Sequence, residues 1–205
     1  MILTGPEIKK EIELGNIQIE PYDESNVQPA SVDLTLGTGV RVYTSQVMFD
    51  ETYSWRADAL KGENLFARVD RALDPKSPHD TIFLEATDDG FLIKPGILYL
   101  MHTQERLHTD KYVSVLDGKS SIGRLGVVVH LTAGYGDPGF NGQYTLEVTC
   151  VHPIILYPKM KIAQMRFHTL QGEVDLSYAT RGHYNGATAR GAIASMAHTQ
   201  FKEAK

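Results

Sequence analysis

The residues numbered 118–147 hold most of the side chains in this chain that could do chemistry. The segment opens with Gly-Lys-Ser-Ser at 118–121, a basic turn with two hydroxyl groups, and Arg124 follows closely. An Asp-Pro-Gly turn at Asp137 and a strand glutamate, Glu147, complete the group. A basic turn suits a polyanion, and a carboxylate suits proton transfer. Together they indicate proton chemistry on a phosphorylated substrate.

Each feature also has an ordinary structural explanation. The run 117–121 is similar to the end of a Walker A loop, but the upstream glycine of such a loop falls at Val113. A capped turn with a solvated lysine is the simpler interpretation of this run alone. Residues 120–124 could form one helical turn, which would put Ser120 and Arg124 on the same side. Asp-Pro-Gly is most often only a turn, and Glu147 could simply face water. If a second subunit covered Glu147, the loss of solvent would raise its pKa toward the range useful for proton transfer. Oligomerisation is therefore part of the hypothesis.

Composition limits the class of protein. The 205 residues are 42% hydrophobic and 22% charged, which is ordinary for one globular domain. The net charge of -5 argues against nucleic-acid or membrane-surface partners, because phosphate-rich surfaces attract basic proteins. A single cysteine, Cys150, excludes an intramolecular disulfide and favours a reducing compartment. With neither a signal sequence nor an apolar run near the roughly 18 residues of a membrane span, we expect a cytoplasmic protein.

The eight histidines show no spacing typical of a metal site. A zinc-dependent deaminase needs an H-x-E element and a P-C-x-x-C element, which one cysteine cannot supply. We therefore expect no zinc and no metal bound by the protein. His130 lies in an apolar run and is interpreted as a core histidine.

The elements that must position these groups are mostly short strands. Thr-Gly-Pro-Glu at 4–7 predicts a capping box for a short helix with Ile8, Ile12 and Leu14 on one face, ending at Gly15. Alternating apolar runs then predict strands at 31–36, 40–43, 81–86, 90–93, 97–103, 112–117, 126–133, 143–151, 154–157 and 161–170. Their spacing predicts a mainly β fold, either a distorted barrel or a jelly-roll-like sandwich.

Three further segments complete the expected organisation. In the strand 143–150 we expect two faces, with Tyr144, Leu146, Val148 and Cys150 in the core and Gln143, Thr145, Glu147 and Thr149 toward a pocket or water. Residues 50–80 look irregular, with a helical turn near 57–60. The chain divides into one β domain at 1–176 and a tail at 177–205, which is either disordered or a lid that orders over a ligand.

Four stretches together resemble the dCTP deaminase and dUTPase superfamily, specifically its dCTP deaminase branch. Residues 28–37 are similar to the family's early strand, and residues 118–126 are similar to its G-[RK]-S-S-x-x-R-x-G signature. Residues 132–147 are similar to its T-A-x-x-x-D-P-G-[WF]-x-G turn followed by Leu-Glu, and residues 156–164 are similar to its L-x-P-G-M-x-I-x-Q stretch. The resemblance covers nearly the whole chain. It implies a dUTPase-like homotrimer with sites at subunit interfaces. Its hydrolase activity, without a catalytic metal, would convert dCTP to dUTP and ammonia in pyrimidine deoxynucleotide biosynthesis.

The resemblance also implies roles for single residues. Glu147 matches the catalytic glutamate that moves protons from water to N3 and the leaving amine. Ser120 and the carbonyl of Ala133 would position the water, and Arg124 would orient the polar cluster. Substrate contacts would come from Lys119 and Ser121 at the phosphates, Asp137 at the 3'-hydroxyl and the backbone near Thr145 at the base. Magnesium would accompany the triphosphate and screen its charge.

The chain departs from the family pattern in the tail and in the central turn. The lid candidates are Tyr178, Arg181, His183 and Tyr184, but Asn-Gly-Ala at 185–187 stands where a glutamine-containing segment is expected. Gly134 follows Ala133, as in trimeric dUTPases and bifunctional deaminase–dUTPases, and could leave room for a second water near the α-phosphate. Gly136 replaces the usual apolar residue and could change the shape of the turn.

Several functions stay open alongside dCTP deamination. A bifunctional enzyme would also release dUMP and pyrophosphate, and a dUTPase would act on dUTP alone. A third alternative, from a different class, is a non-catalytic β-barrel that serves as a structural or regulatory module. A modified cytosine substrate and inhibition by dTTP are also open.

Overall fold

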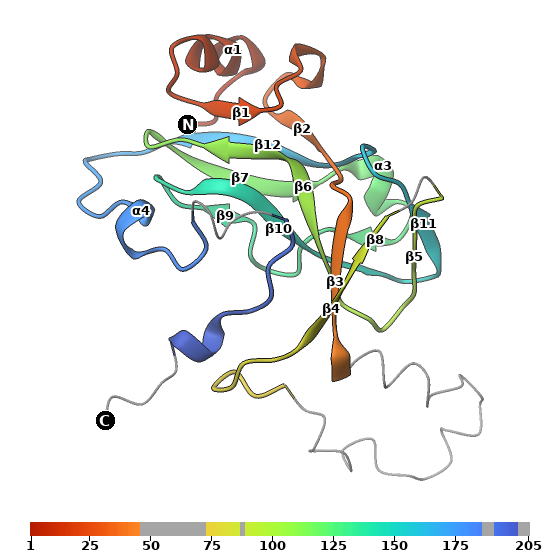
Figure 1. The fold of residues 1–205 in the computed structure, drawn as a ribbon. Coiled ribbons are helices and arrows are strands. Elements are labelled where there is room, and N and C mark those ends of the chain that lie inside the picture. Colours follow the sequence, from red (N-terminus) through yellow and green to blue (C-terminus); the bar gives the residue numbers. More distant parts are fainter. Residues whose placement is uncertain (46–72, 87–88, 186–190, 201–205) are drawn as a thin grey trace, which may run out of the picture.

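A computed structural model describes residues 1–45, 73–86, 89–185 and 191–200 (Figure 1). The described part of the chain is mainly β, as predicted. Its strands are β1 (Gln18–Glu20), β2 (Val32–Thr35), β3 (Gly39–Tyr43), β4 (Thr81–Glu85), β5 (Phe91–Ile93), β6 (Tyr99–His108), β7 (Tyr112–Gly118), β8 (Val127–Val128), β9 (Tyr135–Gly136), β10 (Asn141–Cys150), β11 (Ile154–Leu156) and β12 (Lys161–Thr169). Its helical segments are α1 (Gly5–Glu13), η1 (Glu24–Asn26), α3 (Ser120–Gly123), α4 (Tyr178–Arg181) and η5 (Ala197–Thr199).

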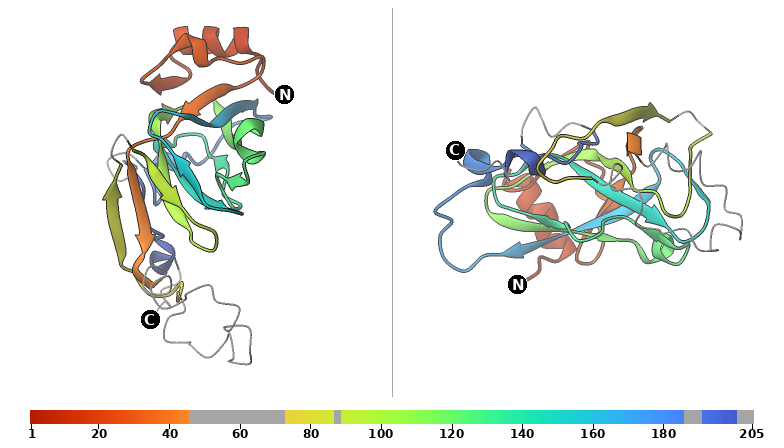
Figure 2. Two further views of the ribbon diagram at one scale, coloured as in Figure 1. Left: turned by 90° about the vertical axis from the view of Figure 1, so that its right-hand side faces the viewer. Right: turned by 90° about the horizontal axis from the view of Figure 1, so that it is seen from below.

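The strands form three sheets in which every pairing is antiparallel. The largest has the order β4-β3-β6-β10-β8, with β1 also paired to β6, and a four-stranded sheet has the order β2-β12-β7-β9. A pair, β11-β5, forms the third. Figure 2 shows α1 and β1 at one end of the molecule and the β3–β4 pair at the other. Among the described strands no sheet closes on itself, so a closed barrel stays a prediction.

The core lies on the inner faces of these strands. Along β10 every second side chain is buried, which confirms the predicted division into a core face and a polar face. Leu146 and Val148 are completely buried there. Burying a side chain of this size contributes about 1.5–3 kcal/mol. None of the described helices is long and apolar enough to cross a membrane.

The first helix, α1, lies close to its predicted bounds, but its start differs from the prediction. Thr4 has the extended backbone of a cap residue, yet its side chain makes no capping hydrogen bond. Glu7 instead accepts a hydrogen bond from Lys10 Nζ at 3.2 Å. The predicted capping box is therefore wrong. A proline in the first turn, Pro6, suits the start because its fixed φ already matches a helix.

The buried face of α1 also differs at one position. Ile8 is fully buried and Ile12 packs against the core, as predicted, whereas Leu14 is 62% exposed. Gly15 has φ 75°, so the helix ends at the predicted glycine and Leu14 turns outward. A charged residue, Glu11, is buried on this helix.

Most predicted strands are present, but the run 126–133 is strand only at β8. The residues that follow form a loop whose backbone groups find partners outside a strand ladder. The N–H group of Leu131 donates to the side chain of Glu147, and the carbonyl of Gly134 accepts from the N–H group of Leu116 at 2.7 Å. The predicted helical turn near 57–60 lies outside the described residues.

We predict that Glu11 stabilises the fold at neutral pH and loses this effect in acid. Its side chain accepts hydrogen bonds from Lys111 Nζ and Asn16 Nδ2, both at 2.8 Å. The bond from Lys111 lowers the pKa of Glu11, against the opposing effect of burial. A depressed pKa means that the stabilisation is complete above the unfolded value of about 4.3 and disappears as the pH falls through the folded value.

Glu11→Gln should therefore lower the free energy of unfolding by roughly 1–3 kcal/mol at pH 7. The difference from the unmodified protein should shrink toward pH 3. Urea unfolding at a series of pH values measures this difference. The matched control is Glu13→Gln, which removes an exposed carboxylate from the same helix. A Glu11→Gln deficit that does not change with pH would contradict the prediction.

Candidate active site

The polar face of β10 opens into a cavity of about 570 Å³. This volume is in the range of small-molecule sites. Side chains of β10 line one side, the loop 131–137 lines a second, and residues of the tail line a third. The cavity brings together a subset of the predicted site residues, namely Ala133, Asp137, Thr145, Glu147, Tyr178 and Tyr184.

Glu147 is held in this cavity by the backbone of the neighbouring loop. Its Oε2 accepts a hydrogen bond from the N–H group of Leu131 at 2.9 Å. The side chain is partly exposed, so its remaining lone pairs can accept from water or substrate. Ala133 lies on the same loop and lines the same cavity. The carboxylate of Glu147 and the backbone at Ala133 therefore border the same cavity. A water molecule between them could lose a proton to the carboxylate.

The basic turn lies elsewhere. Lys119, Ser120 and Ser121 line a separate hollow of about 480 Å³, with Gly118 and Gln164. The predicted helical turn is present as α3, and the N–H group of Arg124 donates to the carbonyl of Ser120 at 3.1 Å. The two hollows share no lining residue. A single copy of the chain therefore does not bring Ser120 into the cavity that holds Glu147.

A buried carboxylate anchors the basic turn. Lys119 Nζ forms a very short ion pair with Asp33, whose side chain is 3% exposed. Asp33 also accepts from Gln28 Nε2 at 3.2 Å and lies 3.6 Å from Lys161 Nζ. In this structure Lys119 therefore forms an ion pair with Asp33, and Lys161 lies within ion-pair distance of the same carboxylate. We read Asp33 as the group that fixes the turn's position.

The turn at Asp137 is fixed from several sides. Gly139 has φ 90°, and a Cβ atom there would lie 2.0 Å from Ser177 Oγ, so this position needs glycine. The N–H group of Tyr178 donates to the carbonyl of Pro138 at 3.0 Å. The aromatic rings of Phe140 and Tyr178 meet at a centroid distance of 5.9 Å. The start of the tail therefore supports the rim of the cavity.

The later tail lies along β10 and β3. The N–H groups of Gly191 and Ile193 donate to Gln143 Oε1 at 2.7 Å and to Thr145 Oγ1 at 3.1 Å. The N–H group of Ser195 donates to Tyr43 Oη at 3.1 Å. This part of the tail is ordered against the cavity in the structure, although it carries little apolar pattern. It covers the side of the cavity next to Thr145.

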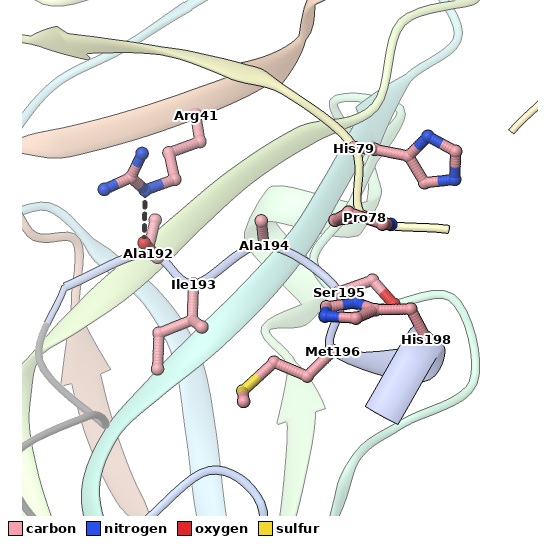
Figure 3. A pocket seen from close by; sticks show the side chains of 9 residues that line it. All are labelled: Arg41, Pro78, His79, Ala192, Ile193, Ala194, Ser195, Met196 and His198. Carbon is pink, nitrogen blue, oxygen red and sulfur yellow. Dashed lines mark hydrogen bonds between the residues drawn. The ribbon is translucent and has the colours of Figure 1, made fainter. Parts of the chain in front are cut away.

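Arg41 of β3 secures the same segment. Its Nε donates to the carbonyl of Ala192 at 2.8 Å, and Figure 3 shows this bond at one end of a third hollow. That hollow, of about 390 Å³, lies between the tail and residues 78–79. Two histidines, His79 and His198, line the other end of this hollow, away from Arg41.

Besides the basic turn and Arg124, two residues predicted for the tail fall outside the main cavity's lining. His183 is exposed, and its Nδ1 lies 3.4 Å from Thr199 Oγ1. Arg181 lines a neighbouring hollow that also contacts Asp137 and Tyr178. Sequence reasoning missed Tyr43 and Ile193, which line the cavity. Neither carried a signal in the sequence, whereas Gln143 lines the cavity from the predicted polar face of β10.

No group of three or more His, Cys, Asp or Glu side chains within the described residues could hold a metal ion. The polar groups of the main cavity are instead one carboxylate on β10, a second on its rim, and several amide and hydroxyl groups. This set suits acid–base chemistry and hydrogen bonding to a polar ring.

Comparisons with known proteins show which family the chain resembles along its length. A family model described as "dCTP deaminase-like" matches residues 2–170. A protein of Clostridium beijerinckii named "dCTP deaminase, dUMP-forming" is 38% identical over 203 residues, which are 99% of this chain and 100% of that protein. A protein of the same name from Clostridium botulinum (strain Eklund 17B / Type B) is 41% identical over 176 residues, which are 86% of this chain and 87% of that protein.

Among solved structures, the 2'-deoxycytidine 5'-triphosphate deaminase of Agrobacterium tumefaciens aligns with a TM-score of 0.54 at 23% identity. The alignment covers 82% of this chain and 48% of that one, and at this identity it shows a shared fold. The family model spans most of the chain, and the relatives align along nearly all of it. The chain therefore belongs to the dCTP deaminase-like family.

Proposed function

We propose that this protein deaminates dCTP at C4 of the cytosine ring and releases ammonia. The observation that carries the proposal is Glu147, held by one backbone hydrogen bond in a cavity of about 570 Å³ beside Ala133. Membership of the family and the names of the relatives support dCTP as the substrate. The activity is that of a hydrolase acting on the C–N bond of a cyclic amidine.

The carboxylate would act as both base and acid. Glu147 takes a proton from a water molecule, and the resulting hydroxide forms a bond to C4. The proton passes to N3, and further proton transfer to the exocyclic amino group makes it a leaving group. The C4–N bond then breaks, ammonia leaves, and a carbonyl remains at C4. One water molecule is consumed for each ammonia released.

The groups around Glu147 would orient the nucleotide. Asp137 at the cavity rim would accept a hydrogen bond from the 3'-hydroxyl, and the backbone near Thr145 would read the base edge. The hydrogen bonds between the tail and β10 support this orientation, because they hold the wall next to Thr145 in place. Tyr178 and Tyr184 line the same volume and add apolar surface.

A complete site would need a second copy of the chain. Ser120, Lys119 and Ser121 line a hollow that is separate from the cavity of Glu147, so a neighbour's basic turn would supply the phosphate contacts and position the water. Exposed apolar side chains near both regions support such an interface, among them Leu125, Val128, Leu131, Tyr135 and Val151. Head-to-tail contacts of this kind close into rings, and we propose a homotrimer.

The same site is proposed to form dUMP. A Cβ atom on Gly134 would lie 2.6 Å from the carbonyl oxygen of Leu116, so this position needs glycine, as in the bifunctional deaminase–dUTPases that the chain resembles here. The second step would use a second water molecule near the α-phosphate. That water would attack the α-phosphorus and release pyrophosphate, so dCTP and two waters give dUMP, pyrophosphate and ammonia. The names of the relatives, which include "dUMP-forming", support this second step.

Magnesium would enter with the triphosphate and screen its charges. The family's chemistry then needs no metal ligand from the chain. The cytoplasmic location and inhibition by dTTP stay predictions.

Glu147→Gln should abolish ammonia release from dCTP while nucleotide binding persists. Removal of a general acid–base group typically lowers the rate about 10²- to 10⁴-fold, and the amide keeps the shape of the side chain. Ammonia is measured by a coupled assay and binding by calorimetry. Glu173→Gln, at an exposed position, is the control. Turnover by Glu147→Gln close to that of the unmodified protein would rule out this role.

The products from the unmodified protein separate the candidate functions. With dCTP, ammonia plus dUTP indicates deamination alone, and ammonia plus dUMP and pyrophosphate indicates both steps. Pyrophosphate from dUTP without ammonia from dCTP would identify a dUTPase. Binding without turnover of either nucleotide would support a non-catalytic module.

Mixing two inactive variants tests the shared site. Ser120→Ala and Glu147→Gln should each be inactive alone. When unfolded together and reassembled, about a quarter of the sites in random trimers would combine an intact Ser120 with an intact Glu147 from different copies. Activity should therefore return in the mixture. If both residues of a site come from one copy, every site in the mixture carries a defect and no activity returns.

A further inference from the structure

The turn that carries Asp137 begins at Gly136, a residue without a side chain. Gly136 belongs to β9 and pairs with Ser114 of β7. A Cβ atom on Gly136 would lie 2.0 Å from Tyr144 Oη and 2.4 Å from Ser114 Oγ. Both distances are far below van der Waals contact. Two hydroxyl groups therefore occupy the space that a side chain would fill here.

These hydroxyl groups form a buried chain that ends on the backbone of Gly136. Tyr144 Oη lies 2.6 Å from Ser114 Oγ, and Ser114 Oγ donates to the carbonyl of Gly136 at 3.3 Å. A serine hydroxyl has one proton, so Tyr144 must be the donor to Ser114. Burial raises the pKa of Tyr144 far above its ordinary value, so the hydroxyl keeps its proton.

The ring of Tyr144 supports the other end of the same turn. The ring of Phe140 packs against it at a centroid distance of 4.7 Å. The N–H group of Phe140 in turn donates to the carbonyl of Asp137 at 3.1 Å, which closes the turn. Tyr144 thus contacts the turn before Asp137 through its hydroxyl and after Asp137 through its ring.

We propose that Tyr144 and Ser114 are positioning residues that aim the Asp137 carboxylate at the 3'-hydroxyl of the substrate's sugar. Gly136 makes room for them. The inference rests on the proposed function, in which Asp137 reads that hydroxyl. The two buried hydroxyl groups act through the backbone of Gly136 rather than on the reacting atoms. They therefore set the preference for nucleotides that carry a 3'-hydroxyl, without taking part in proton transfer.

The test compares kcat/KM for dCTP with kcat/KM for 2',3'-dideoxy-CTP, which lacks the 3'-hydroxyl. A hydrogen bond to a carboxylate gives an expected preference for dCTP of roughly 10- to 150-fold in the unmodified protein. Tyr144→Phe and Gly136→Ala should each reduce this preference about fivefold or more. The loss should fall on dCTP, because the dideoxy nucleotide never used the carboxylate.

Two further variants separate positioning from stability. Tyr99→Phe also removes a buried tyrosine hydroxyl, which accepts from the N–H group of Lys94 at 3.0 Å, but it lies away from the turn. It should change stability and leave the preference intact. Ser114→Ala removes the hydroxyl group that joins Tyr144 to the carbonyl of Gly136, so it should lower the preference as Tyr144→Phe does.

Two outcomes would overturn the inference while leaving dCTP deamination in place. One is an unchanged preference in Tyr144→Phe and Gly136→Ala. The other is an equal loss of activity on both nucleotides. Tyr144→Phe differs by one oxygen atom and supplies a folded variant even if Gly136→Ala fails to fold. If the unmodified protein releases no ammonia from dCTP, the proposed function is wrong and this inference is wrong with it.

Discussion

The alternation of side chains along β10 is the constraint on which the site depends. Successive side chains of a strand point to opposite faces, so burying Leu146 and Val148 turns Glu147 toward the cavity. Antiparallel pairing with β6 places Glu147 opposite Leu100 and fixes the register. A slip by one residue would bury the carboxylate and expose the apolar side chains beside it. The hydrophobic core therefore aims the acidic group.

The loop after β8 is tied to the same carboxylate. Because this loop leaves the sheet, its backbone groups need other partners. Glu147 accepts from the N–H group of Leu131, and Gly134 accepts from the N–H group of Leu116. One hydrogen bond thus does two things: it holds the loop that carries Ala133 against the cavity, and it fixes the orientation of the carboxylate. The loop and the acidic group are positioned together.

Local patterns in the sequence were sufficient for the parts of the fold that local forces decide. The two faces of β10 and the helical turn between Ser120 and Arg124 were predicted, because periodicity and a single turn of backbone are local. The cap at Thr4 was wrong, since Lys10 competes for Glu7. The run 129–133 has the composition of a strand, but the N–H group of Leu131 within it donates to the side chain of Glu147 instead of to a strand partner.

Contacts between distant segments left no local trace. The pairing of Asp33 with Lys119 joins two motifs that are far apart in the chain, and composition cannot indicate which lysine a buried carboxylate will select. The tail was equally hidden, because it binds β10 through backbone N–H groups that every non-proline residue has. The sequence shows that Gly136 departs from the pattern of the family that the chain resembles, but it does not show why. The hydroxyl group of Tyr144 occupies the space of a side chain at this position, and the sequence pattern marks Tyr144 only as a core residue of the strand.

The tail shows how such a segment can be ordered without an apolar pattern. Gly191, Ile193 and Ser195, every second residue of this segment, donate their N–H groups to side chains. Three such bonds contribute about 0.5–1.5 kcal/mol each. Ordering each residue costs about 1–2 kcal/mol, so these bonds alone roughly offset the cost for only a few residues. The bond from Arg41, the burial of Ala192 and the bond from the N–H group of Met196 to Tyr184 Oη add to them, and a nucleotide beneath the tail would add more.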